Sequence, residues 1–129
     1  MAVTGAVSGT IKVGEPNAPD VTITISPVTG TITEYQRGKL TTAAVGPHTL
    51  PMGGVSVAEL VWIKAYTTLT GVPIRCVITL TDNTGAVAWD ETNELLRNCY
   101  GSSTGVSAAT ITMPDAVGYT VEYLFVGTA

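Results

Sequence analysis

The chain has 129 residues, which is the size of one ordinary domain. Its charged fraction is 12%, well below that of a typical soluble domain, and its formal net charge is −4. It contains 22 Thr, 16 Val and 8 Ile, and such β-branched residues favour sheets. This composition excludes an intrinsically disordered chain, which needs low hydrophobicity and high charge, and a helical bundle, which needs runs of strong helix formers.

The charged residues and the start of the chain exclude several partners. The six basic residues are scattered, whereas nucleic-acid binding needs clustered Lys and Arg to displace counterions, so we expect no nucleic-acid partner. The N-terminus has neither a basic region nor a continuous apolar stretch, and no window is long and apolar enough to span a membrane. We therefore expect a soluble protein that is made in the cytoplasm and has no membrane partner.

The N-terminal segment differs from the rest of the chain. Residues 1–14 alternate small side chains with Gly, and Pro16 and Pro19 then form a stiff spacer. Such a segment is too poor in large side chains to build its own core. We expect residues 1–14 to be either an arm used in assembly or an edge strand, followed by a β-sandwich domain at residues 15–129.

Alternation of apolar and polar residues is the main signal along the chain. Residues 57–66 are apolar on both faces, so this strand should be central and covered on both sides, or lie partly in a subunit interface. Residues 82–85 (Asp-Asn-Thr-Gly) predict a hairpin turn, and residues 46–54 are rich in breakers and predict a loop. Residues 90–100 alone have helical composition, with Asp90 or Thr92 as a candidate cap. The expected strands are residues 10–13, 21–25, 31–36, 39–44, 57–66, 74–81, 86–89, 110–113 and 119–126.

Eight or nine short strands separated by regular turns are typical of a sandwich or barrel. We predict an all-β fold, a single-domain antiparallel β-sandwich with jelly-roll-like architecture. Its core should be formed by residues on the alternating apolar faces. They are Val21, Ile23, Ile25, Trp62, Ile74, Cys76, Ile78, Leu80, Val121, Tyr123 and Phe125.

The two cysteines are expected to be free thiols. Cys76 shares an alternating face with Ile74 and Ile78, which predicts a small buried hydrophobic residue, and Cys99 lies in a polar, loop-like stretch. A Cys76–Cys99 disulfide is the alternative, but a cytoplasmic product would be kept reduced.

The sequence assigns no catalytic residue, no cofactor and no metal, and we do not expect an enzyme. His48 lies between breakers without a nucleophile motif, so we interpret it as a solvated loop histidine. Asp90, Glu91 and Glu94 form the one cluster of acids. We interpret them as favourable charges at a helix N-terminus, with a calcium site as the less favoured alternative.

Exposed aromatic side chains would indicate a carbohydrate site, because sugar rings stack on them. Trp62 and Trp89 lie in expected strands beside apolar neighbours, so we expect both to pack in the core. Tyr100, which follows a polar stretch and precedes Gly101, is the best candidate for an exposed aromatic residue.

One layout of strands has a counterpart in known proteins. Glu59-Leu-Val-Trp-Ile-Lys-Ala-Tyr66 followed by Ile74-Arg-Cys-Val-Ile-Thr-Leu-Thr-Asp-Asn-Thr-Gly85 is a strand followed by a hairpin. In this layout, and in its low charge and richness in Thr and Gly, the chain resembles the accessory virion proteins of tailed bacteriophages. These are small jelly-roll or sandwich proteins that decorate capsids or form head fibres and tail knobs. No functional residue carries over from the resemblance.

The resemblance implies symmetric assembly, usually as a homotrimer, on a lattice of major capsid protein in the virion, without a cofactor. The low charge and the two apolar faces of residues 57–66 point the same way, because a monomer of this size does not easily bury so much apolar surface. The expected function is that of a structural virion protein, foremost a capsid decoration (cement) protein. The alternatives are a receptor- or carbohydrate-binding module of a tail fibre or adhesin, and a tail or baseplate component.

Overall fold

The computed structural model describes residues 3–15, 18–32, 34–99, 103–115 and 118–129, with side chains described from residue 34 onward. These residues form ten strands and no helix, which confirms the all-β fold class and adds to the eight or nine strands expected. The strands are β1 (Val3–Glu15), β2 (Ala18–Ile32), β3 (Glu34–Thr42), β4 (Gly46–Thr49), β5 (Val57–Thr67), β6 (Cys76–Asp82), β7 (Val87–Thr92), β8 (Glu94–Asn98), β9 (Val106–Met113) and β10 (Tyr119–Thr128).

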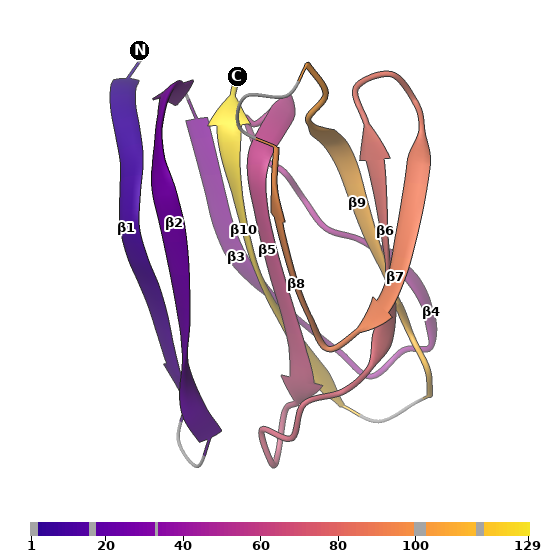
Figure 1. Cartoon of the computed structure of the whole chain (residues 1–129). Helices are drawn as coiled ribbons and strands as arrows, with labels where there is room; N and C mark the ends of the chain where they lie inside the picture. The colour runs from indigo at the N-terminus through magenta and orange to yellow at the C-terminus, as the bar shows by residue number, and fades with distance from the viewer. Residues whose placement is uncertain (1–2, 16–17, 33, 100–102, 116–117) are drawn as a thin grey trace.

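The last eight strands pair in a nested order. β3 pairs with β10, β4 with β9, β5 with β8 and β6 with β7, always antiparallel. The β5–β10 and β6–β9 ladders join these pairs into two four-stranded layers, β8-β5-β10-β3 and β7-β6-β9-β4 (Figure 1). A bridge from Ala58 to Val106 makes them one continuous eight-stranded sheet. This arrangement is a jelly roll, as the strand pattern predicted.

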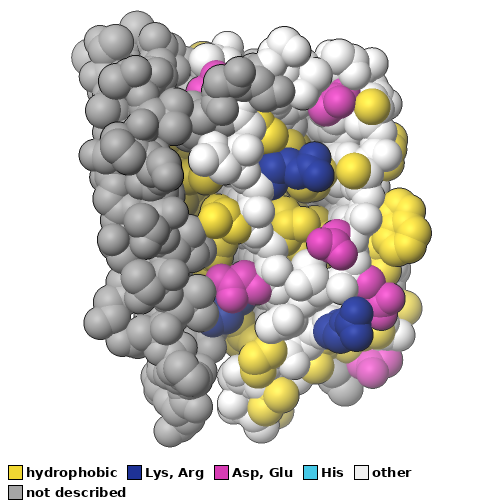
Figure 2. Space-filling model, in the orientation of Figure 1, with side chains coloured by type: hydrophobic (Ala, Val, Ile, Leu, Met, Phe, Trp, Pro, Cys, Tyr) yellow, Lys and Arg dark blue, Asp and Glu magenta, His cyan; other side chains and the backbone are white. Residues whose placement is uncertain are grey.

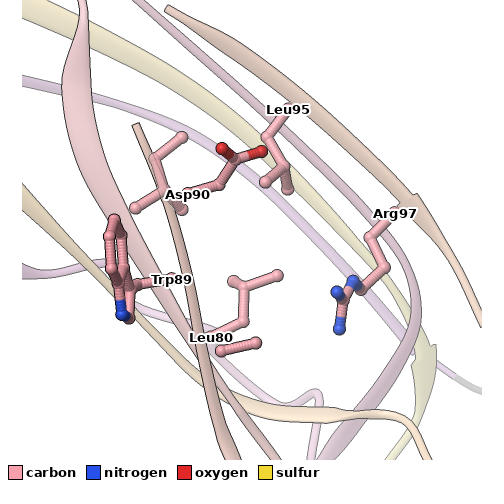
Figure 3. A pocket seen from close by; sticks show the side chains of 7 residues that line it. Leu80, Trp89, Asp90, Leu95 and Arg97 are labelled. Atoms are coloured by element: carbon pink, nitrogen blue, oxygen red, sulfur yellow. The ribbon is translucent and has the colours of Figure 1, made fainter. Parts of the chain in front are cut away.

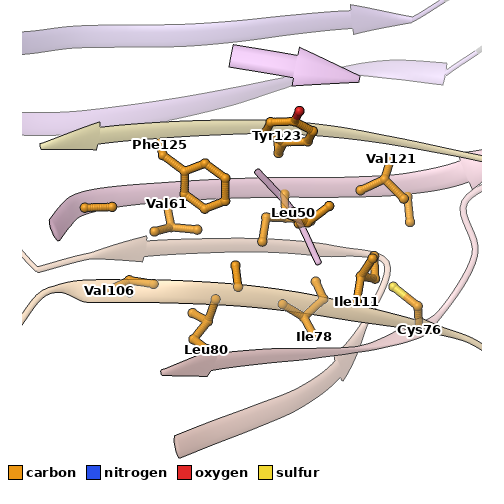
Figure 4. Close-up of a cluster of buried hydrophobic side chains, with 14 of the residues drawn as sticks. Leu50, Val61, Cys76, Ile78, Leu80, Val106, Ile111, Val121, Tyr123 and Phe125 are labelled. Atoms are coloured by element: carbon orange, nitrogen blue, oxygen red, sulfur yellow. The ribbon is translucent and has the colours of Figure 1, made fainter. Parts of the chain in front are cut away.

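The core fills the space between the two layers (Figure 4). Of the residues predicted for it, Cys76, Ile78, Leu80, Val121, Tyr123 and Phe125 are buried in one cluster. Ile74 is partly buried against that cluster. Trp62 is buried too, but on the other face of β5. The side chains of Val21, Ile23 and Ile25 lie outside the described residues.

β5 is the central strand that the sequence predicted. It lies between β10 and β8. Val61, Ile63 and Ala65 face the core and are fully buried. On the opposite face, which we call the outer face, Leu60 and Trp62 are also buried. Burial on both faces explains why this segment is apolar at nearly every position.

The first two strands form a sheet of their own. β1 and β2 pair from Val3↔Ile32 to Glu15↔Ala18, and neither is hydrogen-bonded into the eight-stranded sheet. Figure 1 shows this hairpin as a third layer beside β3, β10 and β5, on the side of the outer face. β2 ends at Ile32 and β3 begins at Glu34, so one residue links the hairpin to the jelly roll. The role of residues 1–14 as an assembly arm stays a prediction.

The segment expected to be helical is extended. Residues 90–100 contribute the end of β7 and all of β8, and residues 100–102 lie outside the described part. β8 pairs with the central strand from Lys64↔Glu94 to Leu60↔Asn98. The Thr92 hydroxyl bonds the backbone of Glu94 instead of capping a helix. Pairing with β5 therefore overrides the weak local helix preference.

The loop expected at residues 46–54 begins as a strand. Residues 46–49 form β4, which pairs with β9, and the Leu50 N–H extends this ladder to the Ala109 carbonyl. An edge strand tolerates Pro47, which cannot donate a backbone hydrogen bond. His48 is thus a half-buried strand residue rather than a solvated loop residue, and its Nε2 lies 3.0 Å from the Ala44 carbonyl oxygen.

The predicted hairpin turn is confirmed between β6 and β7. Asp82 Oδ1 accepts hydrogen bonds from the Thr84 N–H at 2.8 Å and from the Ala86 N–H at 3.0 Å. Gly85 has a φ of 89°, which favours glycine. The bonds from Thr84 lower the pKa of Asp82, because they stabilise its carboxylate.

Candidate functional site

The register of the edge strand β7 decides where Trp89 points. Asp90 pairs with Ile78, whose side chain is in the core, so Ala88 and Asp90 face inward and Trp89 faces outward. Trp89 is 71% exposed, and the expectation that it packs in the core is wrong. The sequence misled because Trp89 follows the apolar run Ala86-Val87-Ala88, but an edge strand leaves its outward face to solvent.

A small pocket opens between the edge strands β7 and β8, and we call it the β7–β8 pocket (Figure 3). Its cavity volume is about 130 Å³. Ile78, Leu80, Ala88 and Leu95 supply apolar lining. Asp90 and Arg97 add an acid and a base to the opening, whereas Trp89, also part of the lining, turns its indole to the other face of β7.

The three acids expected at a helix N-terminus point to three different places. Asp90 lines the pocket, Glu91 is exposed on the opposite side of β7, and Glu94 lies on the outer face of the sheet. Alternation along two strands separates them. Within the described residues no group of His, Cys, Asp and Glu is arranged to hold a metal ion.

A row of alternating charges crosses the outer face. Lys39 lies opposite Glu122, Glu122 opposite Lys64, and Lys64 opposite Glu94, so one residue comes from each strand of the layer. Lys39 Nζ is 3.5 Å from the Glu122 carboxylate. Lys64 is almost fully buried, which a lysine tolerates when carboxylates surround it. Opposite charges therefore alternate across the four strands of this layer.

Both cysteines are free thiols, as predicted, and the alternative disulfide is wrong. Cys76 is buried and its Sγ donates to the Thr92 carbonyl at 3.2 Å. Burial raises the pKa of Cys76 to about 11. Cys99 is half-buried, and burial raises its pKa as well. Two thiols that resist ionisation are poor nucleophiles at neutral pH.

One end of the jelly roll presents exposed apolar side chains, which we call the apolar loop end. Leu69 and Val72 in the β5–β6 loop are 96% and 53% exposed, and Val45 in the β3–β4 loop is 56% exposed. Figure 1 shows both loops at the lower end of the sandwich, and Figure 2 shows hydrophobic side chains gathered at the lower end of the described surface. No charged residue occurs in the sequence between Thr67 and Ile74.

Hydrogen bonds hold the β5–β6 loop in one conformation. The Thr67 N–H bonds the Val72 carbonyl at 2.9 Å, and the Gly71 N–H bonds the Thr67 carbonyl at 2.8 Å. The Val72 N–H also bonds Thr67 Oγ1 at 3.1 Å. Gly71 supplies the positive φ, 69°, that this tight turn requires. Leu69 is therefore displayed by a preorganised loop.

The exposed aromatic residues are not those that the sequence indicated. Tyr100, the expected candidate, lies outside the described residues. Tyr35 on β3 is 66% exposed, and it and Trp89 were both missed. For Tyr35 a signal existed, because it shares one alternating face with Arg37 and Lys39, and two charged neighbours indicate a solvent-facing row.

The described part of the chain contains no helix that is long and apolar enough to cross a membrane. Comparisons with models of protein families, with curated proteins and with solved structures found no match to this chain.

Proposed function

We propose that this protein is a structural virion protein that decorates a capsid by binding to the lattice of its major capsid protein. The apolar loop end carries the proposal. Exposed apolar side chains on an ordered loop lose little conformational entropy when they dock, so they are suited to anchor a protein contact. A decoration protein needs such an anchor and needs no catalytic group.

The fold supports the same proposal in a weaker way. Jelly rolls occur in viral capsid proteins and also in lectins, so the architecture alone does not assign a function. The nested ladders and the shared core make a domain that can act as a stiff building block. We propose that the protein works as a homo-oligomer, with a trimer as the favoured state, and that it is located in the virion.

Particle binding tests the proposal directly. Capsids assembled from the major capsid protein of the same genome are mixed with the purified chain and sedimented. The wild type should co-sediment, and the double variant Leu69→Ser, Val72→Ser should lose most of its binding. Val87→Ser is the matched control, because Val87 is 62% exposed on β7, away from the loop end. Equal binding by the double variant and the wild type would contradict the proposal.

A tail or baseplate component, one of the alternatives to a decoration protein, would use the same apolar loop end. Binding to assembled tails in place of heads, with the same sensitivity to the double variant, would favour that component. A specific observation, the exposed acid and base of the β7–β8 pocket, favours carbohydrate binding as a further property of the domain.

A further inference from the structure

We propose that the β7–β8 pocket binds one pyranose ring of a glycan. This inference goes beyond the proposed capsid function and does not depend on it. The pocket lies where the jelly roll is open, since in the described part of the chain β7 pairs with β6 alone and β8 with β5 alone. A ligand can therefore reach the inner faces of both edge strands without displacing a strand.

The two charged residues of the pocket are available to a ligand. Asp90 and Arg97 are exposed, and among the described residues neither side chain takes part in a hydrogen bond or an ion pair. Figure 3 shows them at different sides of the opening. A carboxylate accepts hydrogen bonds and a guanidinium donates them. Together they match neighbouring hydroxyl groups, each of which can donate and accept.

The apolar lining matches the C–H groups of a sugar ring, as the charged residues match its hydroxyl groups. A pyranose has faces of C–H groups, and the half-buried Leu95 offers apolar surface beside the charged groups, whereas Leu80, which is 3% exposed, adds little. Trp89 is 71% exposed, but its indole faces the other side of β7 and takes no part in holding the ring.

The size of the pocket restricts the ligand to one ring. Its volume of about 130 Å³ is well below the roughly 300–1,000 Å³ of sites for drug-sized molecules. The site is also open to water, which weakens its hydrogen bonds. We therefore expect a dissociation constant in the millimolar range for a free monosaccharide, and tighter binding only when several copies act together.

A peptide strand is the competing ligand for two open strand edges. It would add to the free backbone of β7 or β8. The charges at these positions argue against it, since charged side chains on edge strands discourage strand addition. A glycan uses the same charges as hydrogen-bonding partners, so the chemistry of the opening favours a sugar.

The test is a titration of the full-length ¹⁵N-labelled chain with a panel of neutral monosaccharides, followed by amide chemical shifts. At least one sugar should shift the resonances of the pocket residues in a saturable manner. Asp90→Asn and Arg97→Gln should each weaken binding by about tenfold or more, as expected for a lost hydrogen bond to a charged group. Glu91→Gln is the matched control, because Glu91 neighbours Asp90 but points away from the pocket, and it should bind like the wild type.

Three results would overturn the proposal. The first is the absence of a saturable shift for every sugar through the high-millimolar range. The second is binding that Asp90→Asn and Arg97→Gln leave unchanged, which would place the sugar elsewhere. The third is a response of the β7 amides to a short extended Thr- and Val-rich peptide and not to sugars. Both variants should still co-sediment with capsids, so failure here and failure of the proposed function are distinguishable.

Discussion

Trp62 donates its indole N–H to a carboxylate oxygen of Glu94 across 2.9 Å, and this bond joins the central strand β5 to the edge strand β8. It lies on the outer face, where Trp62 is only 7% exposed. A buried indole needs such a partner. The bond fixes β8 beside β5 at the level of the charged row, in the segment whose composition suggested a helix.

Removing the acceptor of this bond should destabilise the domain. We expect Glu94→Ala to lower the free energy of unfolding by about 1–3 kcal/mol, because it leaves a buried N–H unsatisfied. Glu94→Gln keeps an acceptor oxygen and should cost less. Urea denaturation measures both variants, and Glu91→Ala, an exposed neighbour, is the control. A loss for Glu94→Ala no larger than that of the control would show that the bond contributes nothing.

Ile78 tests the register of the core. Its side chain is completely buried, so Ile78→Ala should cost about 2–5 kcal/mol of unfolding free energy. Val87 lies at an exposed position on the paired strand, so Val87→Ala should change the free energy of unfolding by less than about 0.5 kcal/mol. The two variants are compared by their denaturant midpoints, provided that the slope of the unfolding free energy against denaturant concentration is unchanged. Equal effects of the two substitutions would refute the assigned alternation.

Gly38 makes room for the ring of Tyr123, which lies opposite it on β10. A side chain at Gly38 would collide with the Tyr123 hydroxyl and ring, so Gly38→Ala should destabilise the domain by about 1–3 kcal/mol. Gly118→Ala is the control, because a Cβ there meets only distant atoms of Thr68. The double variant Gly38→Ala, Tyr123→Leu should lose less free energy of unfolding than the two single variants lose in sum. Strict additivity in thermal denaturation would contradict the steric explanation.

The thiol of Cys76 should make the stability depend on alkaline pH. Its pKa is raised by burial from 9.0 to about 11, so the folded state holds this proton more tightly than the unfolded state. The contribution of this thiol to the free energy of unfolding is complete below pH 9 and is lost as the pH rises toward 11. Cys76→Ala should lack this component, and urea denaturation of both proteins across the range measures the difference. A parallel fall in both proteins would assign the effect to other groups.

Thiol counting checks the free state of the cysteines. Denatured protein under non-reducing conditions should contain two reactive thiols, one from Cys76 and one from Cys99. In the native state a maleimide should modify the half-buried Cys99 faster than the buried Cys76. Finding no reactive thiol in the denatured protein would contradict the assignment.

Deleting residues 1–14 tests the N-terminal segment as an assembly arm. β1 is hydrogen-bonded to β2 and not to the eight-stranded sheet, so the truncated chain should stay folded with little change in thermal midpoint. It should lose oligomerisation or particle binding, which light scattering and co-sedimentation measure. Melting of the whole domain on truncation would instead make β1 an integral part of it.

The fold class and part of the core can be read from the amino-acid sequence alone. Alternation places Ile78, Leu80, Val121 and Phe125 on inward faces, and the structure buries all four. The two apolar faces of residues 57–66 identified the central strand β5. The turn at Asp82 was equally readable, because its hydrogen bonds stay within five residues. These features are local, so period and turn chemistry suffice to predict them.

The features that depend on which strands become neighbours follow from the fold and not from any local pattern. Glu94 and Leu95 belong to a strand because β5 offers them a ladder, which outweighs a small helix preference. Trp89 is exposed because β7 is the last strand of its layer, a fact that no local pattern contains. Asp90 and Arg97 meet at one pocket because two edge strands face each other across an open sandwich. Pairing between distant segments sets these positions, and the energy that selects it comes from burial in the assembled sheet rather than from each segment alone.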